Sequence, residues 1–156
     1  TANLVLGENV LRVYLDHKSI AEAGLDLQKV KAEAKRLLEQ KPHIAFVADY
    51  ESVATQPIPQ PIRDRIINGY SRERGGDLLI VTQPGWINSV SDSNYKGTNH
   101  GLWNPDDSHI PLVFMGWGIT KGETFRPTSM ADIAPTVCGL LRIQMPNACV
   151  GNAILP

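Results

Sequence analysis

The chain has 156 residues, a length that fits one domain with a proper buried core. Its hydrophobic content of 42% and charged content of 20% are those of an ordinary globular protein. The formal net charge is −1 with scattered basic residues, which argues against a nucleic-acid surface. No apolar run approaches the ~20 residues of a membrane-spanning helix.

The first half of the chain alternates predicted strands and helices. Leu11, Val13 and Leu15 recur with a period of two, which predicts a strand over 9–16. The pattern Ser19-x-x-Glu22 is typical of a capping box and predicts a short helical turn. The next elements in chain order are a helix capped by Asp26 and reaching about Gln40, a strand over 43–50, a helix from Pro61 to Gly69, and a buried strand over 77–83.

Regularity then stops over residues 84–109. This stretch is rich in Gly, Asn, Ser, Asp and Pro, yet it contains Trp86, Tyr95 and Trp103. Structureless loops longer than ~15 residues are uncommon in compact domains and are usually functional or disordered. Because disordered segments lack large apolar groups, the three aromatic residues predict an ordered, functional loop.

The last part of the chain is predicted to contain a strand, a helix and a tail. The run I-P-L-V-F-M-G over 110–116 predicts another buried strand, and residues 131–141 predict a helix with Ser129 or Asp132 as its cap. The order of strands and helices predicts an α/β sandwich with a mixed, largely parallel central sheet. A split βαβ arrangement is expected within residues 1–83.

His100 is the first candidate for chemistry, because it stands in the run G-T-N-H-G over 97–101. Flanking glycines let the backbone approach another group closely, and an imidazole on such a loop is well presented as a metal ligand or a proton carrier. From spacing alone, a turn histidine is the simpler interpretation, because a single histidine defines no metal site.

A self-contained metal site in this loop is the next alternative. His100, Asp106, Asp107 and His109 offer two imidazoles and two carboxylates, which is a donor set that suits zinc. However, Asp107 and His109 lead directly into the predicted strand at 110, where capping is the common role of such residues.

The remaining candidates are more easily explained by structure. Asp16-His17 ends one strand and precedes a capped turn, which favours turn formation over metal binding. Cys138 and Cys149 match no metal-binding spacing. A buried free thiol at Cys138 is the simpler interpretation, and a disulfide between the two cysteines stays open. No nucleophile elbow, P-loop, dinucleotide fingerprint or H-E-x-x-H motif is present.

Three motifs occur together in the second half of the chain. They are G-T-N-H-G-L-W-N-P-D-D-S-H-I-P-L-V-F-M-G-W-G-I over 97–119, M-A-D-I-A-P-T-V-C-G-L-L-R-I over 130–143, and V-G-N-A-I over 150–154. As a set they resemble the C-terminal segment of the alkaline phosphatase superfamily. The resemblance is greatest to the type I phosphodiesterase and nucleotide pyrophosphatase-like branch, which includes bacterial alkaline phosphatases with a threonine nucleophile.

This resemblance implies a role for His100. The histidine of the family's G-T-x-H-G element is a ligand of one of two catalytic zinc ions, and His100 stands at that position. Thr98 and Asn99 are then candidates for fixing the orientation of the ring. The family's nucleophile and its other ligands lie N-terminal to this region. Asp16-His17 is followed by lysine rather than the glycine of the family's Asp-His pair, so that role is not assigned to it.

The resemblance also implies an organisation and a setting. We expect residues 1–156 to be a single domain and the C-terminal part of a longer alkaline phosphatase-like enzyme that acts on phosphate esters in the periplasm or outside the cell. Within it, residues 1–83 would be a βαβαβ portion, 84–109 the active-site loop, and 110–156 the strand, helix and tail. Its partner would be the missing N-terminal half of the same protein, and we expect neither a nucleic acid nor a membrane as a partner. The chain alone would be inactive.

The resemblance implies no preference between phosphate monoesters and diesters, because in the family the residues that contact the leaving group lie outside the part that this chain matches. The alternative function is a stand-alone α/β binding module, in which the 84–109 loop grips a partner through Trp86, Tyr95 and Trp103.

Overall fold

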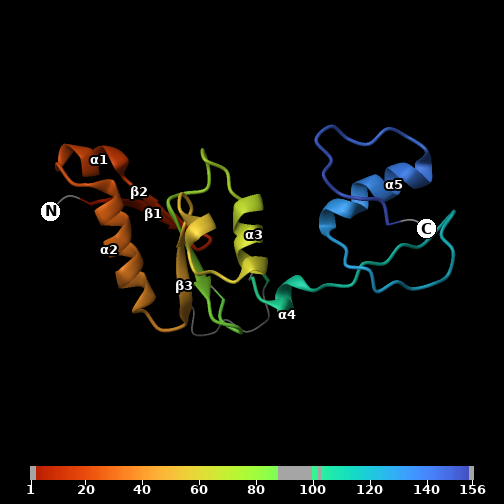
Figure 1. Ribbon diagram of the computed structural model, residues 1–156, viewed down its shortest axis with the longest axis horizontal. Coiled ribbons are helices and arrows are strands. Elements are labelled where there is room, and N and C mark those ends of the chain that lie inside the picture. The colour runs from red at the N-terminus through yellow and green to blue at the C-terminus, as the bar shows by residue number, and fades with distance from the viewer. Residues whose placement is uncertain (1–2, 88–99, 102, 155–156) are drawn as a thin grey trace, which may run out of the picture. The chain divides into compact units, whose positions relative to one another are not determined.

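The computed structural model describes residues 3–87, 100–101 and 103–154. The chain divides into two compact units, residues 1–110 and residues 111–156 (Figure 1). Each unit has its own internal packing, and each is described by itself.

A four-stranded sheet forms the centre of the first unit, with the strand order β1-β2-β4-β3. Among the described residues every strand pairing in it is antiparallel, so the predicted mixed, largely parallel sheet is wrong. The strands are β1 (Val5–Asn9), β2 (Arg12–Leu15), β3 (Ile44–Asp49) and β4 (Leu78–Thr82).

The split βαβ arrangement, in contrast, is confirmed. Both β2 and β3 pair antiparallel with β4, so they run in the same direction with β4 between them. Hydrophobic patterning identified these strands correctly. It does not say which strand pairs with which, and the insertion of β4 between β2 and β3 converts the expected parallel neighbours into two antiparallel pairs.

Two helices connect β2 to β3, namely α1 (His17–Glu22) and α2 (Leu27–Glu39). Asp26 caps α2 as predicted, because its carboxylate accepts a hydrogen bond from the backbone N–H of Lys29 at 3.0 Å. The cap of α1 differs from the prediction. Asp16, rather than Ser19, is the N-cap, and it accepts hydrogen bonds from both the backbone N–H and the hydroxyl of Ser19.

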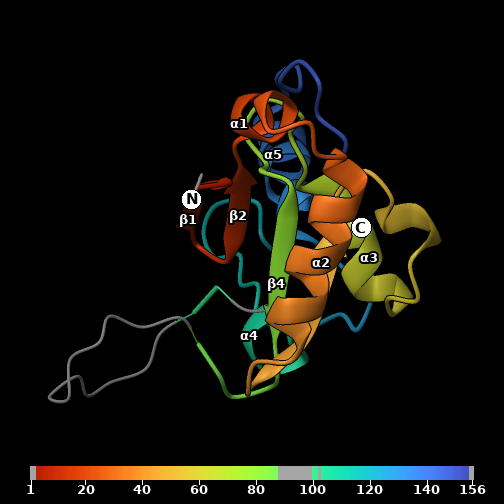
Figure 2. The same ribbon diagram turned by 90° about the vertical axis from the view of Figure 1, so that its left-hand side faces the viewer.

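The helices cover both faces of the sheet. Helices α1 and α2 lie on one side (Figure 1), and α2 crosses β4 in the view of Figure 2. Their apolar residues bury a core with the sheet that consists of Val13, Leu15, Ile20, Val47, Leu78 and Ile80. The first unit is therefore an α/β sandwich in which side chains of β3 and β4 alternate between the two faces.

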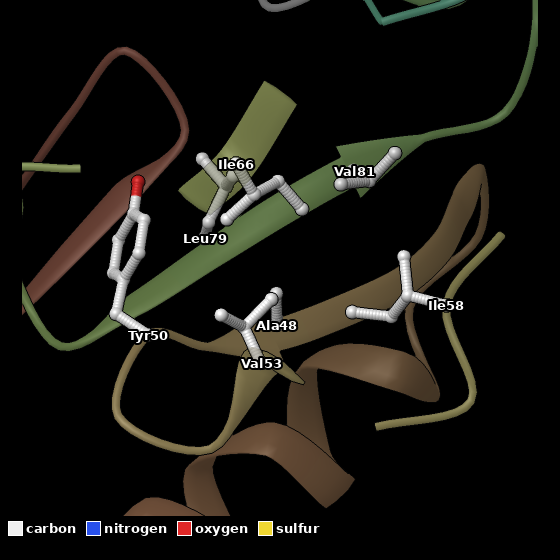
Figure 3. Close-up of a cluster of buried hydrophobic side chains, with 7 residues drawn as sticks. All are labelled: Ala48, Tyr50, Val53, Ile58, Ile66, Leu79 and Val81. Carbon is white, nitrogen blue, oxygen red and sulfur yellow. The ribbon is translucent and has the colours of Figure 1, made fainter. Parts of the chain in front are cut away.

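The other face of the sheet packs against the 3₁₀ turn η1 (Val53–Thr55) and helix α3 (Gln60–Asn68). Figure 3 shows this second core, which consists of Ala48, Tyr50, Val53, Ile58, Ile66, Leu79 and Val81. Helix α3 begins with proline in its first turn and ends at Gly69, as its sequence predicts. Its position on this core becomes important for the loop that carries His100.

The second unit contains the 3₁₀ turn η2 (Met130–Asp132) and helix α5 (Ile133–Leu141). Ser129 and Asp132 form a reciprocal capping box, so both predicted caps are used. The predicted buried strand over 110–116 is not formed. Val113 and Met115 are 81% and 95% exposed, and none of the described strands pairs with this segment.

Candidate functional site

His100 lies on the surface of the first unit, in a segment without regular structure. The backbone of Gly101 has a φ of +112°, which side-chain-bearing residues rarely adopt, and no atom of the described residues lies within 4 Å of the place of a Cβ there. The N–H of Gly101 donates a 2.6 Å hydrogen bond to Oδ2 of Asp107. Thr98 and Asn99, predicted to orient the ring, lie outside the described residues.

Asp107 belongs to the short helix α4 (Pro105–Ser108). Asp106 and Asp107 stand in its first turn, where carboxylates suit the exposed N–H groups, and His109 follows its end. Throughout residues 3–87, 100–101 and 103–154, no three His, Cys, Asp or Glu side chains are placed to hold a metal ion together. The alternative of a self-contained site in this loop is therefore not supported.

The loop is held at its beginning by Trp86. The indole stacks on the imidazole of His43, with ring centroids 3.3 Å apart and an angle of 11° between the planes. The hydroxyl of Thr82, at the end of β4, donates a hydrogen bond to the carbonyl of Trp86 at 2.7 Å. The residues that directly follow β4 are therefore held by contacts to the strand and to His43.

The loop is held at its end by Trp103 and Arg65. Trp103 packs against the core beneath α3, and its carbonyl accepts a 3.0 Å hydrogen bond from Nη1 of Arg65. The same guanidinium nitrogen donates to Oγ of Ser108 at 2.8 Å. Sequence reasoning missed Arg65, because an arginine on a solvated helix face shows no sign of what it reaches.

These positions bear on the proposed binding module. Trp103 is half-buried against the core and Trp86 is occupied by a ring stack, although 47% of Trp86 remains exposed. Tyr95 lies outside the described residues. Trp86 and Trp103 therefore make structural contacts at the two ends of the 84–109 segment, and no contact among the described residues favours their use in gripping a partner.

Asp16-His17 has the structural role that the sequence favoured. Besides the cap made by Asp16, Nε2 of His17 lies 2.6 Å from Oδ1 of Asp77, and Oδ2 of Asp77 accepts from the N–H of Leu15 at 2.8 Å. The hydrogen bonds from Ser19 lower the pKa of Asp16. The pair thereby fastens the start of α1 to the start of β4.

A buried ion pair that the sequence did not reveal lies beneath α2. Lys31 is only 2% exposed, and its Nζ lies 2.6 Å from Oε2 of Glu51 and 3.4 Å from Oδ1 of Asp49. Burial lowers the pKa of Lys31, but the hydrogen bond to Glu51 and the two carboxylate charges outweigh burial and raise it. Among the described residues its partners are carboxylates at the end of β3 and two residues beyond it, so the group connects α2 to the end of this strand.

Two of the family-like motifs meet in the second unit. The N–H of Asn152 donates to Oδ1 of Asp132 at 2.8 Å, and the N–H of Ile154 donates to Oγ1 of Thr136 at 3.0 Å. Gly151 passes so close to Ala131 that no side chain fits. The runs D-I-A-P-T and V-G-N-A-I thus form a structural clasp. Cys138, buried as expected, and Cys149 are both free thiols.

Among the candidate residues, His100 has the chemistry of a single metal ligand. An exposed imidazole between glycines suits zinc as a single ligand, whereas a complete zinc site needs at least three protein ligands. Separately, no helix in the described part of the chain has both the length and the apolar character needed to cross a bilayer.

Comparison with known proteins identifies relatives over nearly the whole chain. The chain is 41% identical over 152 residues to the alkaline phosphatase PafA of Elizabethkingia meningoseptica and 40% identical over 143 residues to the alkaline phosphatase PhoV of Synechococcus elongatus. It is also 40% identical over 153 residues to a Myroides odoratus protein named calcium-transporting ATPase. These matches cover 92–98% of this chain but only 25–28% of the relatives.

The fold of the chain agrees with that of part of a solved alkaline phosphatase structure. The crystal structure of wild-type alkaline phosphatase PafA matches with a TM-score of 0.88 and 41% identity, covering 97% of this chain and 29% of that protein. No family model matches the chain. The extent of the identity, together with the agreement in fold, nevertheless shows a relationship: the chain is homologous to a segment of the alkaline phosphatases PafA and PhoV, and it spans about a quarter of their length.

Proposed function

We propose that this chain is part of a zinc-dependent phosphate-ester hydrolase of the alkaline phosphatase type, acting in the periplasm or outside the cell. In this proposal His100 is a ligand of one of two zinc ions. Residues 1–83, 84–109 and 110–156 are three portions of one domain, with the loop 84–109 at the active site. The chain alone is inactive, because its partner is an N-terminal half that bears the nucleophile and the other ligands.

The observation that carries the proposal is the 41% identity to PafA over 97% of the chain, which includes the G-T-N-H-G element. The exposure of His100 supports it, since a ligand contributed to a shared cleft has to be presented outward. When bound, zinc ions supply Lewis-acid activation of the attacking oxygen and stabilisation of the leaving oxygen. The contribution of this chain is to hold the imidazole in place.

The exposed apolar residues of the second unit also support a larger enzyme. Monomeric proteins rarely leave many large apolar side chains in water, and those that do usually bury them against another part. In the second unit the most exposed are Val113, Met115, Trp117, Phe125 and Val150, each at least 81% exposed. We propose that the N-terminal half covers them.

A chimera tests the role of His100. The homologous segment of PafA is replaced by this chain, and hydrolysis of p-nitrophenyl phosphate and zinc content are measured with and without His100→Ala. We expect the chimera to be active, and the variant to lose zinc and at least about a hundredfold in kcat/KM. His109→Ala, which removes an exposed imidazole of the same loop, is the matched control and keeps both.

Two results would contradict the proposal. One is a His100→Ala chimera that keeps its zinc and its kcat/KM. The other is clear phosphatase activity of the purified 156-residue chain with added zinc that His100→Ala abolishes, because the chain would then hold a complete site.

A further inference from the structure

We propose that Arg65 is a positioning residue for His100, acting through Trp103 and the short helix α4. This inference rests on the proposed function, in which His100 is a metal ligand. It identifies which part of the fold fixes that ligand, namely helix α3, through a side chain that neither the family motifs nor its own sequence neighbourhood points to.

The first step is the attachment of Arg65 to the scaffold. The next residue, Ile66, is 1% exposed in the core between α3 and the sheet, so the helix is a rigid base. Arg65 itself faces solvent and reaches across to the returning loop. Its Nη1 donates to the carbonyl of Trp103 and to Oγ of Ser108, which precede and end α4, respectively.

The second step is the fixing of α4 itself. Ser108 accepts from Arg65 and donates its own hydroxyl proton to the carbonyl of Asn104 at 2.8 Å, so both roles of that hydroxyl are assigned. The backbone N–H of Ser108 also donates to Asn104. One guanidinium nitrogen thus holds both ends of a four-residue helix that is too short to be stable alone.

The third step connects α4 to the ligand. Asp107, in the middle of this helix, accepts the 2.6 Å hydrogen bond from the N–H of Gly101. The N–H of Gly101 belongs to the peptide unit that also contains the carbonyl of His100, so this bond fixes the backbone next to the imidazole. At a φ of +112° a glycine has many alternatives, and the hydrogen bond selects one of them.

The contacts predict a local effect that is separate from stability. Because Arg65 is exposed, its removal costs the whole fold little, whereas the loop loses the donor that holds both ends of α4. Ser108→Ala removes the same connection from the other side. Arg63 lies on the same helix and, among the described residues, makes a long 3.5 Å hydrogen bond to the carbonyl of Ala54 and none to α4, so Arg63→Gln is the matched control.

The test is nuclear magnetic resonance on the 156-residue chain, which measures amide exchange at Gly101 and the ring signals of His100. We expect Arg65→Gln and Ser108→Ala to speed exchange at Gly101 about tenfold and to shift the His100 ring signals. The urea midpoint of unfolding should stay that of the wild type. Arg65→Lys, which keeps one cationic donor, should restore part of the protection.

The outcomes separate this inference from the proposed function. Wild-type exchange at Gly101 in both Arg65→Gln and Ser108→Ala would overturn it, and so would an equal change in Arg63→Gln. The proposed function fails by a different result, namely a PafA chimera that keeps its zinc after His100→Ala. Faster exchange at Gly101 alongside that result would still establish Arg65 as the residue that positions His100.

Discussion

The N–H of Asn152 donates a hydrogen bond to Oδ1 of Asp132, which joins the C-terminal segment to the start of α5. The other oxygen of the same carboxylate accepts from the N–H of Ser129 at 2.8 Å. One aspartate therefore closes the capping box and also holds a segment 20 residues further along the chain.

Acid should open the clasp at Asp132. The hydrogen bonds from Asn152 and Ser129 hold the pKa of Asp132 below its usual value of 3.8. A lowered pKa means that the stabilisation is present above pH 3.8 and is lost as the pH falls through the folded-state pKa. As the pH falls from 5 to 2, the amide signal of Asn152 should therefore shift, and its protection relative to the intrinsic exchange rate at each pH should fall. In Asp132→Asn this protection should be low throughout; wild-type protection that does not change with pH would contradict the prediction.

Gly151→Ala should destabilise the second unit. A Cβ at this position would overlap the carbonyl oxygen of Ala131, which as a backbone atom cannot move aside as the end of a flexible side chain can. We expect a loss of about 1–3 kcal/mol in the free energy of unfolding, measured with urea. Gly122→Ala is the control, because no atom lies within 4 Å of its Cβ position. Equal stability of the two variants would contradict the prediction, because it would mean that the backbone around Gly151 can move to accommodate a Cβ.

Lys31→Met should destabilise the first unit by about 2 kcal/mol, because it leaves the carboxylates of Asp49 and Glu51 without their shared cation. Lys29→Met, an exposed position on the same helix, should change stability little. The pKa of Lys31 is raised, so the contribution of the charged Lys31 to stability is present below pH 10.5 and is lost as the pH rises through the folded-state pKa. In urea unfolding, the difference in the free energy of unfolding between wild type and Lys31→Met should therefore become smaller at high pH. A difference that does not depend on pH would assign the effect to packing alone.

His43→Ala should lower the free energy of unfolding by about 1 kcal/mol through loss of the ring stack with Trp86. His43→Phe keeps a flat ring at the same place and should recover most of that loss. The fluorescence emission of the tryptophans should shift to the red in His43→Ala as Trp86 becomes more exposed. Indistinguishable spectra and stabilities for the two variants would indicate that the stack does not hold the loop entry.

Local sequence patterns predicted most elements of the first unit, for identifiable reasons. Asp26 is a cap with a periodic apolar stripe behind it, and β4 is a continuous apolar run. Strand β1 was missed because it ends in a turn at Val10 and Leu11, which have φ values of 49° and 65°. Such turns usually contain Asn-Gly, so neither residue indicates one.

Some residues of the candidate site could be predicted from the sequence and others could not. His100 could be singled out from a short motif, because glycines on both sides of an imidazole are a local signal. Arg65 could not, since its role depends on the distance between α3 and the end of a loop 38 residues later. The buried position of Lys31 is likewise a consequence of β3 ending beneath α2.

The sequence by itself determined where strands and helices form, which residues cap them and which histidine is presented, because these follow from the spacing of neighbouring side chains. Only the tertiary structure decided that β4 lies between β2 and β3, that residues 110–116 do not pair as a strand, and that α3 holds the His100 loop. Strand pairing and long side-chain contacts depend on which distant segments become neighbours, and the spacing of residues along the chain does not contain that information.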